Sequence, residues 1–249
     1  MPDHLELLSG LDGISLRALD ERAALLRRVD SKYVVRRNTF AELLERLRGD
    51  HCVLEIDGRR AFSYTTTYFD TAQLRCFVDH IEDRLPRFKA RSRVYEDSGE
   101  CTFEVKLKRS EDETDKRQVD YDQAVRTRVT EQAMECVRNA LAAAGLTAPG
   151  SLKPTLTTSF DRITLVARDG SQRMTCDLGA TLRGPHGETA MPGELLLVET
   201  KSEDGDGPAD RELARLHVEP VSLSKYRVGM SLVGAGRQFG SQPGSDLFG

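Results

Sequence analysis

The stretch RFKARSRVY (residues 87–95) decides the fold that we expect for this chain. Basic residues occupy every second position of it. Successive side chains of a strand point to opposite faces, so a strand here places four cations on one face. They are Arg87, Lys89, Arg91 and Arg93. Neighbours on that face, about 7 Å apart, repel by about 2 kcal/mol at the effective dielectric of a protein surface. An enclosed face of this kind therefore requires an anion.

The composition shows that the basic stripe is a local feature and that the chain as a whole is not basic. The chain has 249 residues, 31% of them charged, and a formal net charge of -4, and it contains no Trp. These properties argue against a nucleic-acid binder, which carries a broadly basic or aromatic-interleaved surface. The chain shows no apolar run long enough to cross a bilayer and no signal peptide, so we expect a cytoplasmic protein. A membrane-bound partner is left open. The five cysteines lack metal or disulfide spacing and are predicted to be buried, reduced thiols.

Periodicity predicts many short strands and few helices. Helical spacing covers 15–28, a capping box of Thr39 and Glu42 opens a helix that stops at Gly49, Thr130 caps a helix over 130–144, and Pro208 opens another. Strands are predicted at 29–35, 61–69, 86–95, 102–109, 117–122, 155–167, 173–182, 194–201 and 221–226. Because few of these strands are joined by helices, they favour an antiparallel sheet. The predicted divisions are a helical segment at 1–28, one domain at 29–233 and a flexible tail at 234–249.

The basic stripe continues into a predicted hairpin. If DSGE (97–100) is its loop, Glu96 pairs with Cys101, and Arg93 then lies opposite Glu104. In this register charged side chains share one face of the hairpin and apolar side chains share the other.

Other strands repeat the alternation with acids and bases together, as in Glu199 with Lys201 and Asp30 with Lys32. The charged face is then either the wet face of an ordinary sandwich or the lining of a closed antiparallel barrel with helices outside. The density of cations favours the α+β barrel with a charged interior. Basic groups bind phosphate oxygens, and carboxylates hold a divalent metal that bridges them.

An ordered set of motifs resembles a known family. DSKY (30–33), TTTYFDT (65–71), FKARSRVY (88–95), FEVKLK (103–108), TTSFDR (157–162), CD (176–177), VETK (198–201) and SKY (224–226) together resemble the VTC domain. This is the catalytic domain of the vacuolar transporter chaperone polyphosphate polymerase, a triphosphate tunnel metalloenzyme. The resemblance implies an antiparallel barrel of about eight strands with a basic tunnel, and a metal cofactor, Mn²⁺ or Mg²⁺.

The resemblance also implies roles for individual residues. The catalytic cations are Lys32, Arg91, Arg93, Lys106, Arg162 and Lys201. The substrate-binding residues are Lys89, Lys108, Lys116, Ser224, Lys225 and Tyr226. The metal carboxylate is Glu199, with Glu104 and Asp177 as further metal-binding or orienting carboxylates.

One departure from the tunnel pattern bears on the reaction. Hydrolytic relatives begin with E-x-E-x-K, whereas this chain reads RVDSK, with Arg28 in place of the first Glu and Asp30 in place of the second. The loss of one metal carboxylate favours a polymerase that transfers the γ-phosphate of ATP to inorganic polyphosphate. The alternatives are a triphosphatase of the same class and a module that binds polyphosphate or triphosphate without turnover.

Overall fold

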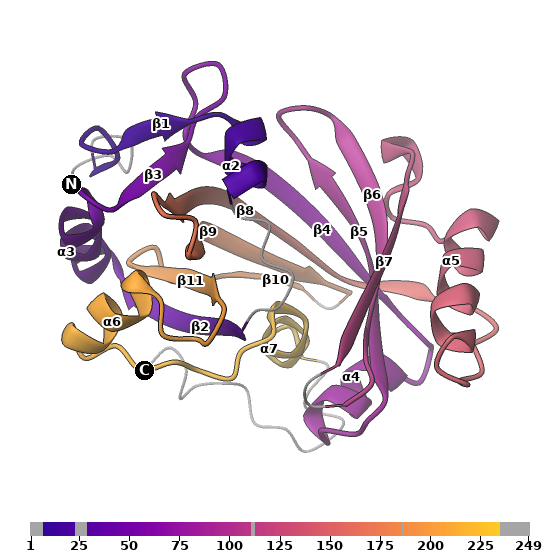
Figure 1. The fold of residues 1–249 in the computed structure, drawn as a ribbon. Coiled ribbons are helices and arrows are strands. Elements are labelled where there is room, and N and C mark those ends of the chain that lie inside the picture. Colours follow the sequence, from indigo (N-terminus) through magenta and orange to yellow (C-terminus); the bar gives the residue numbers. More distant parts are fainter. Residues whose placement is uncertain (1–6, 23–28, 111–112, 186, 235–249) are drawn as a thin grey trace. The chain divides into compact units, whose positions relative to one another are not determined.

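The chain folds into two compact units, each assembled from segments that are distant in sequence (Figure 1). The computed structural model describes residues 7–22, 29–110, 113–185 and 187–234. Unit 1 comprises Met1–Phe62, Phe160–Ala180 and Met191–Leu223, and unit 2 comprises Ser63–Ser159, Thr181–Ala190 and Ser224–Gly249. The predicted helical residues 23–28 and the tail from 235 onward lie outside the described residues.

The strands form one mostly antiparallel sheet whose main path runs in the order β2–β11–β9–β8–β4–β5–β6–β7. The predicted closed barrel is wrong. β2 and β7 are the two ends of this path, and within the described residues they do not pair with each other, so the sheet is open. Alternation of charged and apolar residues could not reveal this, because a half-buried open sheet and a barrel wall show the same period of two.

Unit 1 packs two helices on the apolar face of its strands. β2 (Val29–Arg36) pairs with β11 (Leu195–Ser202), which pairs with β9 (Gln172–Gly184). Val35, Val198 and Cys176 are buried on one face together with residues of α3 (Arg37–Leu47) and α6 (Pro208–Arg215). The opposite face of these strands carries the alternating charged residues.

The remaining elements of unit 1 extend its edge. β1 (Asp12–Ile14) pairs in parallel with β3 (His51–Leu54), and β3 pairs with β8 (Lys153–Ala167). Helix α2 (Leu16–Arg22) buries Leu19 in a small cluster with Val166.

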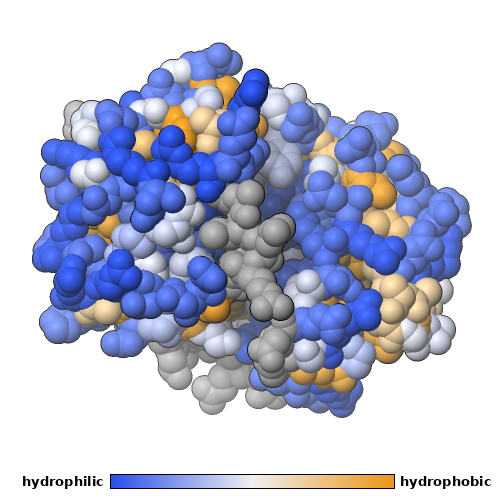
Figure 2. All heavy atoms as spheres, in the orientation of Figure 1, coloured by the Kyte–Doolittle hydropathy of each residue, from blue (hydrophilic) through white to orange (hydrophobic). Residues whose placement is uncertain are grey.

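Unit 2 is built on the antiparallel strands β4 (Phe62–Asp70), β5 (Arg87–Tyr95), β6 (Glu100–Lys108) and β7 (Thr114–Asp120). Their apolar side chains pack with α4 (Arg75–Ile81), α5 (Glu131–Ala142) and α7 (Lys225–Leu232). A short β10 (Gly187–Ala190) pairs with β9. Phe88, Phe103 and Leu107 are among the fully buried side chains. On the face drawn in Figure 2, hydrophilic residues predominate and apolar residues form small, separated patches.

The β5–β6 hairpin forms, but the predicted register is wrong by two residues. Tyr95 pairs with Glu100, so Arg91, and not Arg93, lies opposite Glu104. The turn is set by Gly99, which has a φ of 74° and donates its N–H to the carbonyl oxygen of Tyr95 at 2.8 Å. A shift of two keeps every side chain on its predicted face, which is why the alternation did not detect it.

Of three further local predictions, the structure confirms one and contradicts two. Thr130 caps α5 by accepting the N–H of Ala133, as predicted. Thr39 lies inside α3, which begins at Arg37, so the predicted capping box does not form. Residues 221–226 do not form a strand, because α7 begins at Lys225.

Candidate functional site

Three lysines form a row across the charged face of unit 2. Lys89 on β5 lies opposite Lys106 on β6, which lies opposite Lys116 on β7. Neighbouring strands are about 4.8 Å apart, and like charges directly opposite one another are destabilising. The row therefore gains most when an anion with several charges lies along it. Arg87 and Lys108 are opposite each other in the next row, so the basic character continues along the strands.

The carboxylate of Glu104 on β6 pairs with one lysine of this row and with the neighbouring Arg91. It accepts a hydrogen bond from Nε of Arg91 at 2.6 Å, and Nζ of Lys116 lies 2.9 Å from its second oxygen. Burial by itself raises the pKa of Glu104, but Arg91, Arg93 and Lys116 outweigh burial and lower the pKa to about 2. Glu104 is thus ionised at neutral pH and orients two of the predicted phosphate-binding cations.

Arg93 occupies the next position of the same face. Its guanidinium carbon lies 5.9 Å from the ring centre of Tyr64, at cation–π distance, and its strand partner on β4 is Thr66. Arg93 also lies close enough to Glu104 to help lower the pKa of that carboxyl, so its guanidinium is placed by an aromatic ring and a nearby carboxylate.

The SKY motif joins this face through α7. Ser224 caps the helix by accepting the N–H of Arg227 at 3.4 Å, and Nζ of Lys89 donates to the same hydroxyl at 3.1 Å. Lys225 is the first helical residue. The motif therefore lies beside the predicted substrate-binding stripe.

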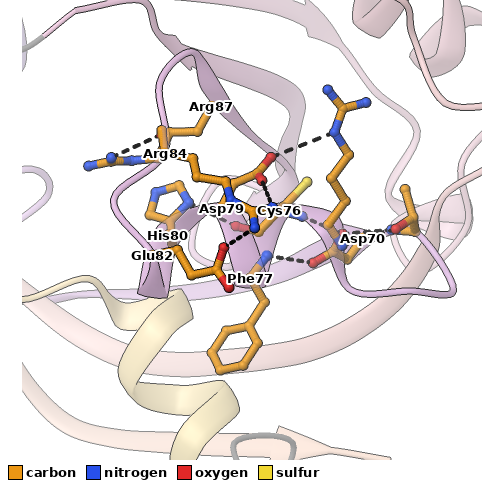
Figure 3. Close-up of polar contacts among 10 residues, drawn as sticks. Asp70, Cys76, Phe77, Asp79, His80, Glu82, Arg84 and Arg87 are labelled. Atoms are coloured by element: carbon orange, nitrogen blue, oxygen red, sulfur yellow. Dashed lines mark hydrogen bonds and ion pairs between the residues drawn. The ribbon is translucent and has the colours of Figure 1, made fainter. Parts of the chain in front are cut away.

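Tyr226 points into the interior of unit 2. It is 1% exposed, stacks on Tyr68 with ring centres 5.1 Å apart, and donates its hydroxyl to Asp70 at 2.6 Å. Burial and the Asp70 carboxylate raise the pKa of Tyr226. Asp70 also accepts the N–H groups of Cys76 and Phe77, at 2.8 and 2.9 Å, and so holds the start of α4 (Figure 3). The structure thus gives Tyr226 buried protein partners.

The charged face of unit 1 centres on Lys201. Its Nζ lies 3.1 Å from Glu199 and 3.8 Å from Asp30. Lys32 on β2 lies directly opposite Glu199 on β11. The backbone oxygen of Lys32 accepts the N–H of Val221 at 2.7 Å, which fixes the chain at this lysine. Two cations and two carboxylates are thus placed on adjacent strands.

Arg162 and Asp177 form a two-point ion pair on the neighbouring strands β8 and β9. Nε and a terminal nitrogen of Arg162 donate to the two carboxylate oxygens at 2.7 and 3.0 Å. The guanidinium carbon is 5.2 Å from the ring centre of Phe160. Parallel hydrogen bonds of this kind fix the plane of the guanidinium. Asp177 therefore orients Arg162.

The carboxylates differ in how well they fit a divalent metal. Glu104 and Asp177 are engaged by arginine, and the described residues contain no group of three His, Cys, Asp or Glu side chains suited to a metal. Mg²⁺ is commonly held by one or two carboxylates together with substrate phosphates and water. Glu199 and Asp30 are paired with Lys201, and a single carboxylate such as Glu199 fits a metal that takes most of its ligands from the substrate.

Sequence reasoning missed one buried carboxylate of unit 1, Asp210. It lies at the third position of α6 and accepts the N–H of Gly207 at 2.9 Å, a helix-start pattern that the sequence shows as GPAD. Its bonds to residues of β2 and β11 join segments too distant in sequence to be inferred from spacing.

Faces lined by arginine and lysine, with isolated carboxylates that orient them, define a sheet protein suited to anions of several charges. The family model of the VTC domain matches residues 27–233. The chain therefore belongs to the VTC domain family, as its motifs predict.

Solved structures to which the chain is similar include that of an adenylate cyclase candidate from Vibrio parahaemolyticus. It is 14% identical, with 80% of this chain and 95% of that chain covered and a TM-score of 0.45. A Hippeastrum adenylyl cyclase candidate, described as having a dominant triphosphatase activity, is 16% identical, with 82% and 95% covered and a TM-score of 0.48. The Pct1 RNA triphosphatase of S. pombe is 13% identical, with 87% and 77% covered and a TM-score of 0.29. No curated protein sequence matches the chain. Among the described residues, no helix is both long and apolar enough to cross a membrane.

Proposed function

We propose that this protein is a polyphosphate polymerase that transfers the γ-phosphate of ATP to a growing inorganic polyphosphate chain. The observation that carries the proposal is the row of Lys89, Lys106 and Lys116, which lie opposite one another on three adjacent strands. A linear anion with a charge on every unit matches such a row better than a compact ligand. Phosphoryl transfer requires chiefly positioning and charge neutralisation, which cations on a rigid sheet supply.

The residues of unit 2 bind the phosphate chain in this proposal. Lys106 and Arg93 contact the transferred group, and Glu104 holds Arg91 in the orientation that its ion pair defines. Lys89, Lys108, Lys116, Ser224 and Lys225 bind phosphates further along the chain. Tyr226 contributes indirectly, because its hydroxyl is bonded to Asp70.

The residues of unit 1 supply the metal carboxylate and further cations. Glu199 would hold Mn²⁺ or Mg²⁺, and the ion would neutralise charge on the phosphate oxygens. Lys32 and Lys201 bind phosphate oxygens, and Arg162 does so in the plane set by Asp177. No side chain serves as nucleophile, because a terminal phosphate oxygen of the acceptor attacks the γ-phosphorus and ADP leaves.

Replacing E-x-E-x-K by RVDSK favours transfer to polyphosphate over hydrolysis. A site with fewer carboxylates near the metal has less means of activating a water molecule, whereas a phosphate acceptor carries its own negative oxygen. The proposed substrates are thus ATP and inorganic polyphosphate or triphosphate.

The test is incubation of the purified protein with ATP and Mn²⁺, with and without tripolyphosphate, followed by gel electrophoresis with polyphosphate staining. We expect a growing ladder with matching ADP release, and its loss in Lys106→Ala. The matched control is Lys153→Ala, which removes an exposed lysine at the start of β8. Release of orthophosphate without a ladder would assign a triphosphatase instead. Tight binding of tripolyphosphate without turnover would assign a binding module.

A further inference from the structure

Asp210 is a buried carboxylate held entirely by uncharged donors. It is 6% exposed and accepts hydrogen bonds from the Tyr33 hydroxyl at 2.7 Å, the Thr200 hydroxyl at 2.5 Å and the Gln172 amide at 2.6 Å. The N–H of Gly207 completes the set at 2.9 Å. A buried carboxylate is costly unless it is well hydrogen-bonded, and four donors from four parts of the chain meet this requirement.

Two of these donors are next to proposed site residues in sequence. Tyr33 follows Lys32 on β2, and Thr200 lies between Glu199 and Lys201 on β11. Because adjacent side chains of a strand point to opposite faces, Tyr33 and Thr200 extend toward α6 while their neighbours stand on the charged face. Asp210 therefore binds side chains of both strands on the face of the sheet opposite the charged face.

The need for this grip follows from the position of β2. Among the described residues β2 pairs with β11 alone on the main path of the sheet, and outside this pairing the backbone oxygen of Lys32 accepts the N–H of Val221. The Tyr33–Asp210 bond adds a restraint perpendicular to the sheet, and the Thr200–Asp210 bond applies the same restraint to β11 at the same oxygen atom, Oδ1. Displacement of β2 relative to β11, perpendicular to the sheet, is thereby restrained at one atom.

We propose that Asp210 is a positioning residue that sets Lys32, Glu199 and Lys201 on the charged face by holding Tyr33 and Thr200 from beneath. The inference rests on the proposed function. It also explains the order of residues in DSKY, where the lysine serves the site and the tyrosine anchors it.

The same construction occurs within unit 2. In SKY the tyrosine, Tyr226, donates its hydroxyl to the buried Asp70, and the preceding residue is Lys225. Both lysine–tyrosine pairs of the two motifs thus place the tyrosine on a buried aspartate.

The experiment removes single hydroxyl groups and measures turnover and stability together. Thr200→Val and Tyr33→Phe each delete one donor to Asp210, whereas Thr200→Ser keeps the hydroxyl. The matched control is Tyr121→Phe in unit 2, which deletes a buried hydroxyl that donates to the backbone oxygen of Arg128 at 2.7 Å. Measured quantities are the unfolding midpoint, kcat, KM for ATP and Kd for tripolyphosphate.

We expect Thr200→Val and Tyr33→Phe to lower kcat about tenfold or more, since small misplacements of reacting groups cost this much. Thr200→Ser should restore most of kcat, and Tyr121→Phe should keep kcat at an unfolding midpoint similar to that of Tyr33→Phe. The inference is overturned if Thr200→Val and Tyr33→Phe keep the kcat of the control.

Failure of the proposed function gives a different result. If the wild-type protein binds tripolyphosphate but makes no polyphosphate, the polymerase assignment fails. The positioning role of Asp210 is then tested by the Kd for tripolyphosphate of the same variants. A Kd raised severalfold by Thr200→Val and restored by Thr200→Ser supports the inference, and an unchanged Kd overturns it. Absence of both turnover and binding in the wild type overturns both proposals.

Discussion

Replacing Glu104 by glutamine should cost stability at neutral pH and cost almost none in acid. The carboxylate is 3% exposed and is paired with Arg91 and Lys116, which lower its pKa to about 2 from an ordinary value of 4.5. A difference of this size corresponds to about 3 kcal/mol, since one pKa unit is about 1.4 kcal/mol. Because Lys116 is 48% exposed and screened by water, we expect about 2–3 kcal/mol for Glu104→Gln at pH 7.

The sign of the pH dependence follows from proton uptake. Between pH 4.5 and pH 2 the unfolded chain binds a proton at Glu104 and the folded protein does not, so acid favours unfolding. The stabilisation is complete above pH 4.5 and is lost as the pH falls toward 2. Glutamine does not titrate, so the difference between wild type and variant should shrink over this window.

The assay is urea unfolding of both proteins at pH steps from 7 to 2.5, with the free energy of unfolding extrapolated to water. Glu135→Gln is the matched control, because Glu135 is exposed on α5 and its replacement should change little at any pH. A difference for Glu104→Gln that stays constant with pH, or grows in acid, would refute the role of the ion pairs.

The remaining predictions concern single groups in either unit. His80 is buried near Lys89, and burial followed by the charge of Lys89 lowers the pKa of His80 to about 3. The NMR signals of His80 should therefore not titrate between pH 5 and 8, and the free energy of unfolding should fall as the pH drops below 6.5. An NMR titration midpoint near pH 6.5 would contradict this. Leu213 of α6 is 0% exposed, and Leu213→Ala should lower the free energy of unfolding by about 2–5 kcal/mol in urea titrations. Arg162→Lys should cost about 1–3 kcal/mol in the same assay, because a lysine cannot form both bonds to Asp177, and an unchanged unfolding midpoint would argue against the pairing.

Alternation in the sequence predicted which face each strand residue occupies, and less about which residues meet. The β5–β6 strands have the predicted faces, yet their register differs by two, because Gly99 and not Glu100 ends the turn. Period-two patterns are insensitive to such shifts. The ion pair of Arg91 with Glu104 therefore needed the structure.

Closure of the sheet and the supports of the site could not be predicted from the same pattern. Whether a sheet closes depends on how its end strands are placed, which leaves no trace in alternation. Asp210 and Asp70 bind tyrosines 177 and 156 residues away in the sequence, respectively. Helix starts were predictable where a cap is local, as at Thr130, and wrong where a stronger context prevailed, as at Thr39 inside α3.

The buried cysteines provide a native reporter of local opening. All five are free and buried, as predicted, with Cys52 and Cys176 in unit 1 and Cys76, Cys101 and Cys136 in unit 2. Burial raises the pKa of Cys76 and Cys176, so a thiol reagent must wait until the surrounding structure opens. Labelling followed by peptide mass spectrometry would time each unit separately. Equal labelling rates at all five cysteines would mean that the two units open together. One labelling rate for the cysteines of unit 1 and another for those of unit 2 would show that each unit opens independently.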